Sequence, residues 1–233
     1  MRRSALLASL TTAAVAAVMA GATPASAINT YNAEPAPERT EVGALVVQYD
    51  RDGNPATPDV VRWSCSGTMI SANVFLTAAH CTANRPAGAK FYVSLDQDVQ
   101  AAIDASNAQG GTPEQIAARV GVQGVAHWDA AYPGDSADAH DIAVIEFNTA
   151  QAADLADRWD FTPATLPAAG QFDAMGPRAL DAATWQVMGY GTEEALNGPG
   201  GQTHPGGGVR MKAEVGFDAL NKTWPAFRSF ASI

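Results

Sequence analysis

His80 is the residue whose type and surroundings are best suited to proton-transfer chemistry. It follows the apolar run 74–76 and two small residues, Ala78 and Ala79, and it directly precedes Cys81. The alanines leave room around the imidazole, and a general base has to be held within hydrogen-bond reach of the proton that it takes. His80 is therefore predicted to be a general base rather than a packed structural histidine.

Asp141 is the natural partner for this histidine. It opens the apolar run 142–145, and a carboxylate at the mouth of a buried strand has to be paired or solvated. A carboxylate that pairs with a buried histidine fixes the imidazole tautomer and stabilises the imidazolium. We therefore expect Asp141 to orient a buried His80, with a solvated aspartate at the strand edge as the alternative.

The first 27 residues predict an export signal. Arg2 and Arg3 precede a stretch of mostly small and apolar residues, 5–20, and residues 25–27 form an A-x-A cleavage site. A membrane anchor is the weaker alternative, because the stretch falls short of the ~20 residues that span a bilayer. We expect a secreted protein with no membrane association after signal cleavage.

The two cysteines, Cys65 and Cys81, predict one disulfide if the protein reaches an oxidising compartment. Such a bridge would fix the backbone at His80. Two free buried thiols are the alternative. A zinc site is disfavoured because no second pair of cysteines or histidines lies at ligand spacing, so we expect no metal and no cofactor.

Composition narrows the class of protein. Of the 233 residues 47% are hydrophobic, which excludes wholesale disorder and allows a sizeable core. The formal net charge of −10 argues against binding nucleic acid through a basic face.

The elements that have to position His80 and Asp141 are mostly predicted strands. Apolar or alternating runs predict strands at 42–49, 60–70, 74–77, 91–95, 142–147, 185–188 and 209–217. The last of these strands is expected to have a solvent-exposed face that carries Arg210, Lys212 and Glu214. Segments 98–108 and 112–119 predict short surface helices, and the glycine-rich segment 198–208 predicts a mobile loop. Many short strands separated by turns predict an all-β barrel or sandwich.

With these residues in place, the chain resembles the trypsin-like (chymotrypsin-fold) serine endopeptidases over roughly residues 42–217. Residues 65–81 are similar to the family's CxGxLI…LTAAHC block, which holds the histidine and a local disulfide. Residues 141–144 resemble the DIAL block that supplies the aspartate, and residues 189–191 resemble the GWG or GYG motif that opens the second barrel. The resemblance implies a double antiparallel six-stranded β-barrel with the active site between the barrels.

The same resemblance implies a domain organisation. After the signal peptide, 1–27, one peptidase domain covers 28–233. Its first barrel covers 28–155 with a helical insertion near 98–119, and an incomplete second barrel covers 181–233. The tail after residue 221 loses strand alternation.

No residue matches the family's nucleophile. The family places its serine in a GDSGG block, which these 233 residues do not contain. Ser136 follows Gly and Asp but lacks the next glycines, and a turn explains it better. Ser229 and Ser232 lack the flanking glycines of an oxyanion hole. We therefore expect a chain that stops before its nucleophile and is inactive as written.

The favoured function is a secreted, monomeric serine endopeptidase acting on proteins or peptides. The alternative is a non-catalytic secreted pseudoprotease that binds or scaffolds other molecules. A metal-dependent hydrolase using His80, His127, His140 and Asp141 is a third possibility, and it lacks any helix-spaced pair of ligands.

Overall fold

The computed structural model describes residues 32–54, 56–134, 139–192, 196–199, 201–203, 206–220 and 228–232. The predicted signal peptide and Ser136 lie outside the described residues. Among the described residues, no helix has the length and apolar character needed to cross a membrane.

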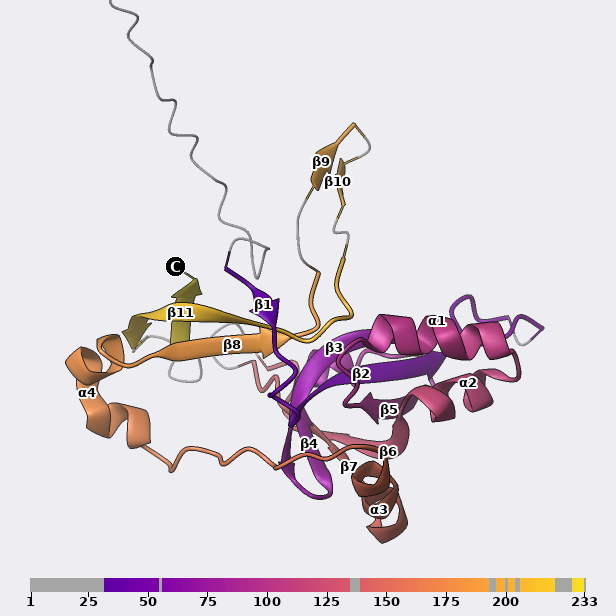
Figure 1. Cartoon of the computed structure of the whole chain (residues 1–233), viewed down its shortest axis with the longest axis horizontal. Helices are drawn as coiled ribbons and strands as arrows, with labels where there is room; N and C mark the ends of the chain where they lie inside the picture. The colour runs from indigo at the N-terminus through magenta and orange to yellow at the C-terminus, as the bar shows by residue number, and fades with distance from the viewer. Residues whose placement is uncertain are drawn as a thin grey trace, which may run out of the picture.

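Six antiparallel strands close into a barrel in the order β2-β3-β4-β7-β6-β5 (Figure 1). They are β2 (Val42–Tyr49), β3 (Val60–Ser71), β4 (Val74–Thr77), β5 (Lys90–Ser94), β6 (Val122–Trp128) and β7 (Ala143–Glu146). Leu45, Met69, Phe75 and Ile145 fill its interior, and each is fully buried. The prediction of an all-β fold built on a six-stranded antiparallel barrel is confirmed.

The helices lie on the outside of the barrel or beyond it. They are α1 (Val99–Gln109), α2 (Pro113–Val120), α3 (Thr149–Arg158) and α4 (Gln171–Asp181), and a single 3-10 turn, η1 (Ala79–Cys81), follows β4. The helices predicted at 98–108 and 112–119 are present as α1 and α2. Asp98 caps the first through Ala101 N–H, and Thr112 forms a capping box with Gln115 at the start of the second.

Strand β2 is apolar except for Gln48, because both of its faces are covered. Leu45 points into the barrel, whereas Ala44 and Val46 pack outward against the core that Ile103 and Val120 build under α1 and α2. Seven of its eight residues are buried. A continuous apolar run is typical of a strand that is covered on two sides.

Two helices and one barrel strand were not predicted. Helix α3 begins with a capping box between Asn148 and Gln151, a signal that sequence inspection could have found. Helix α4 contains Gly176, with φ 74°, followed by Pro177, so its pattern is interrupted. The pattern of β6 is broken by Gly124, beside which Ile145 and Phe147 pack so closely that a Cβ would clash with them.

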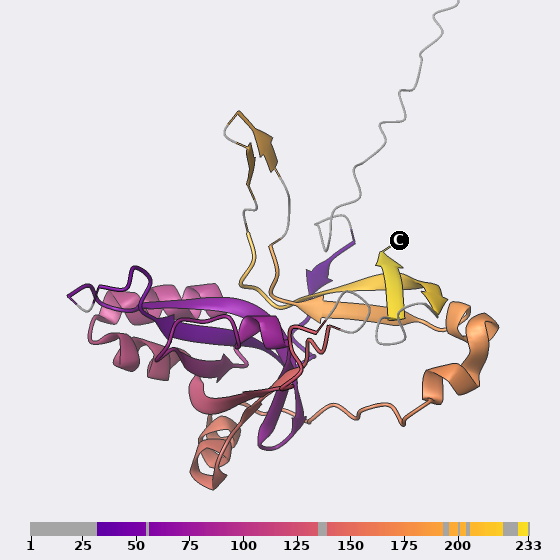
Figure 2. The same cartoon turned by 180° about the vertical axis from the view of Figure 1, so that it is seen from behind.

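The remaining strands form an open sheet and a hairpin. They are β1 (Glu34–Pro35), β8 (Trp185–Gly189), β9 (Leu196–Gly198), β10 (Gly201–Thr203), β11 (Met211–Leu220) and β12 (Arg228–Ser232). β11 pairs with β1, β8 and β12, and this sheet lies beside the barrel in both views, while β9 and β10 project away as a hairpin (Figures 1 and 2).

One prediction about this region is wrong, and one strand of it was not predicted. The glycine-rich segment 198–208 contains β10 rather than only a loop, because Gln202 pairs with Asn197 across a tight turn. The tail also contains a strand, β12, which pairs with β11 through backbone hydrogen bonds that need no side-chain alternation. Among the described residues, the segment predicted to begin a second barrel is an open sheet.

Arg210 is buried, so the prediction that it lies on the solvent-exposed face of the strand is wrong. It precedes β11 and so lies outside the alternation of that strand, and its exposed fraction is 2%. Its guanidinium donates to Tyr190 Oη at 3.0 Å, to the Arg39 carbonyl at 3.0 Å and to the Leu95 carbonyl. These bonds fasten the start of β11 to the barrel.

Tyr190, which directly follows β8 of the open sheet, is the side-chain partner of Arg210 and is itself fully buried. Its hydroxyl donates to the Asp96 carbonyl at 2.6 Å, and its N–H donates to Ser66 Oγ at 2.8 Å. Burial raises the pKa of Tyr190 to about 12, although the nearby Arg210 lowers it. The phenol therefore stays neutral, so it donates one hydrogen bond and accepts another.

Replacing Arg210 with methionine should lower the free energy of unfolding by about 3 kcal/mol. The substitution removes the guanidinium donor from the buried Tyr190 hydroxyl and the buried Leu95 carbonyl, and each unsatisfied group is worth ~1–3 kcal/mol. Urea unfolding followed by circular dichroism measures the change. Arg62→Met, at an exposed position of β3, is the matched control and should change stability little. Equal stabilities of the two variants would contradict this role of Arg210.

Candidate active site

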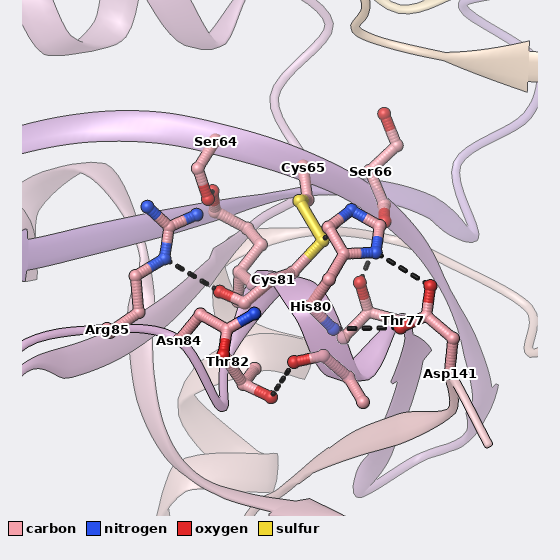
Figure 3. The surroundings of a disulfide bond; sticks show 12 residues. Ser64, Cys65, Ser66, Thr77, His80, Cys81, Thr82, Asn84, Arg85 and Asp141 are labelled. Carbon is pink, nitrogen blue, oxygen red and sulfur yellow. Dashed lines mark hydrogen bonds and ion pairs between the residues drawn. A yellow bond between two sulfur atoms is a disulfide. The ribbon is translucent and has the colours of Figure 1, made fainter. Parts of the chain in front are cut away.

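The turn η1 places His80 at the rim of the barrel. The chain leaves β4 at Thr77, and Cys81 at the end of η1 is joined by a disulfide to Cys65 on the neighbouring strand β3 (Figure 3). Thr77 Oγ1 also donates to the Ser66 carbonyl at 3.0 Å. The predicted disulfide is thus present, and it holds the turn that carries His80.

Strand pairing brings Asp141 to the same place although it lies 61 residues away in the sequence. β4 and β7 are antiparallel neighbours, with Thr77 opposite Ala143. The residues that follow β4 and those that precede β7 therefore meet at one edge of the sheet. His80 comes three residues after Thr77, and Asp141 comes two residues before Ala143.

The carboxylate of Asp141 holds His80 by two atoms. Asp141 Oδ2 lies 2.8 Å from His80 Nδ1, and Asp141 Oδ1 accepts the His80 backbone N–H at 2.8 Å (Figure 3). Partial burial pushes the pKa of Asp141 upward, but the hydrogen bonds from the His80 ring and backbone outweigh it, so this pKa lies below its ordinary value. The carboxylate is therefore ionised at neutral pH.

With its proton on Nδ1, the His80 ring donates to Asp141 and keeps a lone pair on Nε2. The expectation that His80 is buried is wrong, since 56% of its side chain is exposed against 32% for Asp141. Both lie on segments at the barrel rim, outside the packed interior. Nε2 lies 3.4 Å from Cys81 Sγ. Such an imidazole can take a proton from a group that approaches from outside the barrel.

A second histidine–carboxylate pair braces the segment that carries Asp141. The backbone of His140 has φ 48°, a left-handed conformation that residues other than glycine rarely adopt. Its Nδ1 lies 3.0 Å from Asp129 Oδ2. Asp129 also accepts the Ala131 N–H at 2.9 Å, and this bond, followed by the one to His140, lowers the pKa of Asp129. Sequence reasoning missed Asp129, because no pattern in the chain signals this turn.

The residues proposed for a metal-dependent hydrolase are not gathered in one place. His80 pairs with Asp141, whereas His127 Nε2 lies 3.4 Å from Glu146 Oε2 on β6 and β7. Within the described ranges, the single group of three possible metal ligands is Cys65, His80 and Cys81. Both of its sulfurs are consumed by the disulfide, so the oxidised protein offers no metal site there.

Among the residues that the structure describes, no serine is placed to act as the nucleophile. Ser66 Oγ accepts the Tyr190 N–H, so this side chain has a structural role. Ser229 and Ser232 belong to β12. In the part of the chain that the structure describes, no hydroxyl group forms a hydrogen bond with His80 Nε2.

A known protein family matches most of this chain. Residues 37–204 match the family model described as Trypsin. One similar solved structure is neuropsin, a serine protease expressed in the limbic system of mouse brain. The two are 19% identical over 86% of this chain and 68% of that one, with a TM-score of 0.45. Another is the drosophila Grass clip serine protease of the Toll pathway. It is 20% identical over 84% of this chain and about half (49%) of its own length, with a TM-score of 0.44. A comparison with curated proteins found no match.

Removing the imidazole should raise the pKa of Asp141. His80→Ala deletes the ring donor that stabilises the carboxylate but keeps the backbone N–H, so the pKa rises toward that of an ordinary aspartate without reaching it. Carbon-13 NMR titration of the carboxyl group measures this shift. His127→Ala is the matched control and leaves the pKa of Asp141 in place. A lower or unchanged pKa in His80→Ala would contradict the described pair.

Proposed function

The chain belongs to the trypsin family of serine proteases, and from this premise we propose that it is a secreted endopeptidase chain in which His80 is the general base and Asp141 orients it. The observation that carries the proposal is the two-point contact of Asp141 with His80. A carboxylate on Nδ1 selects the tautomer whose Nε2 can accept a proton and stabilises the imidazolium that results.

The proposed reaction is hydrolysis of a peptide bond in a protein or peptide substrate. A serine hydroxyl attacks the carbonyl carbon while Nε2 of His80 takes its proton. The imidazolium, held by Asp141, then returns the proton to the leaving amine. The exposed face of His80 supports this role because nucleophile and substrate both have to reach Nε2. The chemistry requires neither a metal nor a cofactor.

The nucleophile is the part of this mechanism that the 233 residues do not supply. They contain no GDSGG block, and the described hydroxyl groups do not contact His80 Nε2. A serine nucleophile, its histidine base and the orienting aspartate act as a triad, and loss of one member lowers the rate by several orders of magnitude. We therefore propose that a polypeptide of these residues alone has no measurable peptidase activity. Secretion and a monomeric state belong to the same proposal, and the signal-like residues 1–27 support secretion.

A serine-directed phosphonate should not label the purified chain. The reagent forms a bond only with a serine whose hydroxyl is activated by a base, and among the residues that the structure describes no serine hydroxyl is hydrogen-bonded to His80 Nε2. Intact-mass spectrometry measures labelling, with an active trypsin-family protease in the same buffer as the positive control. Stoichiometric labelling of one serine, lost in His80→Ala, would show that the chain does supply its nucleophile and would overturn the proposed inactivity.

A further inference from the structure

The disulfide lies in direct contact with the exposed histidine. His80 Nε2 is 3.4 Å from Cys81 Sγ, and the two sulfurs and one ring nitrogen of His80 all lie within 4.8 Å of one another. Figure 3 shows the imidazole beside the bridge. A disulfide that only ties two strands together needs no imidazole at one of its sulfurs, so this contact supports chemistry at the bridge itself.

The two cysteines differ in how a reagent can reach them. Cys81 is 2% exposed and belongs to the core of the barrel. Cys65 on β3 is only partly buried and packs at the border of that core. A small thiol from solvent therefore reaches Cys65 more easily, which makes Cys81 the sulfur that leaves.

The surroundings of Cys81 stabilise a negative charge on its sulfur. Once Nε2 of His80 has taken a proton, the imidazolium directs one N–H to Asp141 and the other toward Cys81 Sγ. Thiolates are stabilised beside a histidine cation, and a thiol that is more stable as an anion is a faster leaving group in exchange.

We propose that the Cys65–Cys81 disulfide is a thiol-exchange site for small external thiols, with Cys65 as the attacked sulfur and His80 assisting the departure of Cys81. Nε2 of His80 takes the proton of the external thiol, the resulting thiolate forms a bond with Cys65 Sγ, the bond between the two protein sulfurs breaks, and its electron pair stays on Cys81 Sγ. The products are a mixed disulfide on Cys65 and a Cys81 thiolate paired with the His80 imidazolium. No net oxidant is needed, because the incoming thiol is oxidised as Cys81 is reduced.

This reaction does not depend on the proposed peptidase function, but it acts on the same turn. Exchange removes the covalent tie between η1 and β3, which holds His80 at the barrel rim. It also leaves a thiolate beside a base that a carboxylate orients, which is the arrangement of an activated cysteine nucleophile.

The position of the adduct tests the proposal without any substitution. The folded, oxidised chain is incubated with reduced glutathione, quenched with N-ethylmaleimide in mild acid and mapped by peptide mass spectrometry. Glutathione on Cys65 and maleimide on Cys81 are expected. Glutathione on Cys81, or failure to form any adduct while the chain stays folded, would overturn the proposal.

The rate tests the part played by His80. His80→Gln should slow adduct formation about tenfold at neutral pH, because the external thiol loses the base that takes its proton and the Cys81 thiolate loses its imidazolium partner. His127→Gln changes an exposed histidine on β6 that is paired with Glu146, and it should leave the rate unchanged. Equal rates in His80→Gln and the unsubstituted chain would remove His80 from the reaction. Because no phosphonate or peptide substrate is involved, this outcome is separate from the outcome of the labelling experiment.

Discussion

The pairing of β4 with β7 is the interaction on which the rest of the site depends. It closes the barrel, and it also makes the end of one strand and the beginning of the other neighbours at the rim. His80 and Asp141 each lie just beyond that paired segment, so the same backbone bonds that complete the barrel set the distance between them. The disulfide and the Asp129–His140 pair then brace the two ends separately.

A second constraint attaches the open sheet to the barrel. Arg210 brings a positive charge into the interior, and a buried charge is tolerated only when its hydrogen bonds are satisfied. Tyr190 provides one acceptor and backbone carbonyls of the barrel and its N-terminal segment provide the others. Because Tyr190 also binds Ser66 on β3, this cluster reaches the strand that carries Cys65. The sheet and the candidate site are therefore linked through one barrel strand.

Sequence reasoning was most successful where chemistry and strand pattern coincide. His80 follows an apolar strand and Asp141 precedes one, so both could be placed at strand ends before their contact was known. Arg210 was misplaced because alternation alone cannot show where a strand begins. Asp129 was missed because its role arises from the positive φ of His140, and dihedral angles leave no period in a sequence. The exposure of His80 also depends on tertiary structure.

The central claim is that Asp141 fixes the tautomer of His80 that can act as a base. The most direct measurement is the nitrogen-15 NMR spectrum of the neutral His80 ring, which distinguishes a proton on Nδ1 from one on Nε2. The account predicts Nδ1–H in the unsubstituted chain and a shift toward Nε2–H in Asp141→Ala, because the carboxylate acceptor at 2.8 Å is gone. A ring protonated on Nε2 in the unsubstituted chain, or one whose tautomer is unaffected by Asp141→Ala, would contradict it.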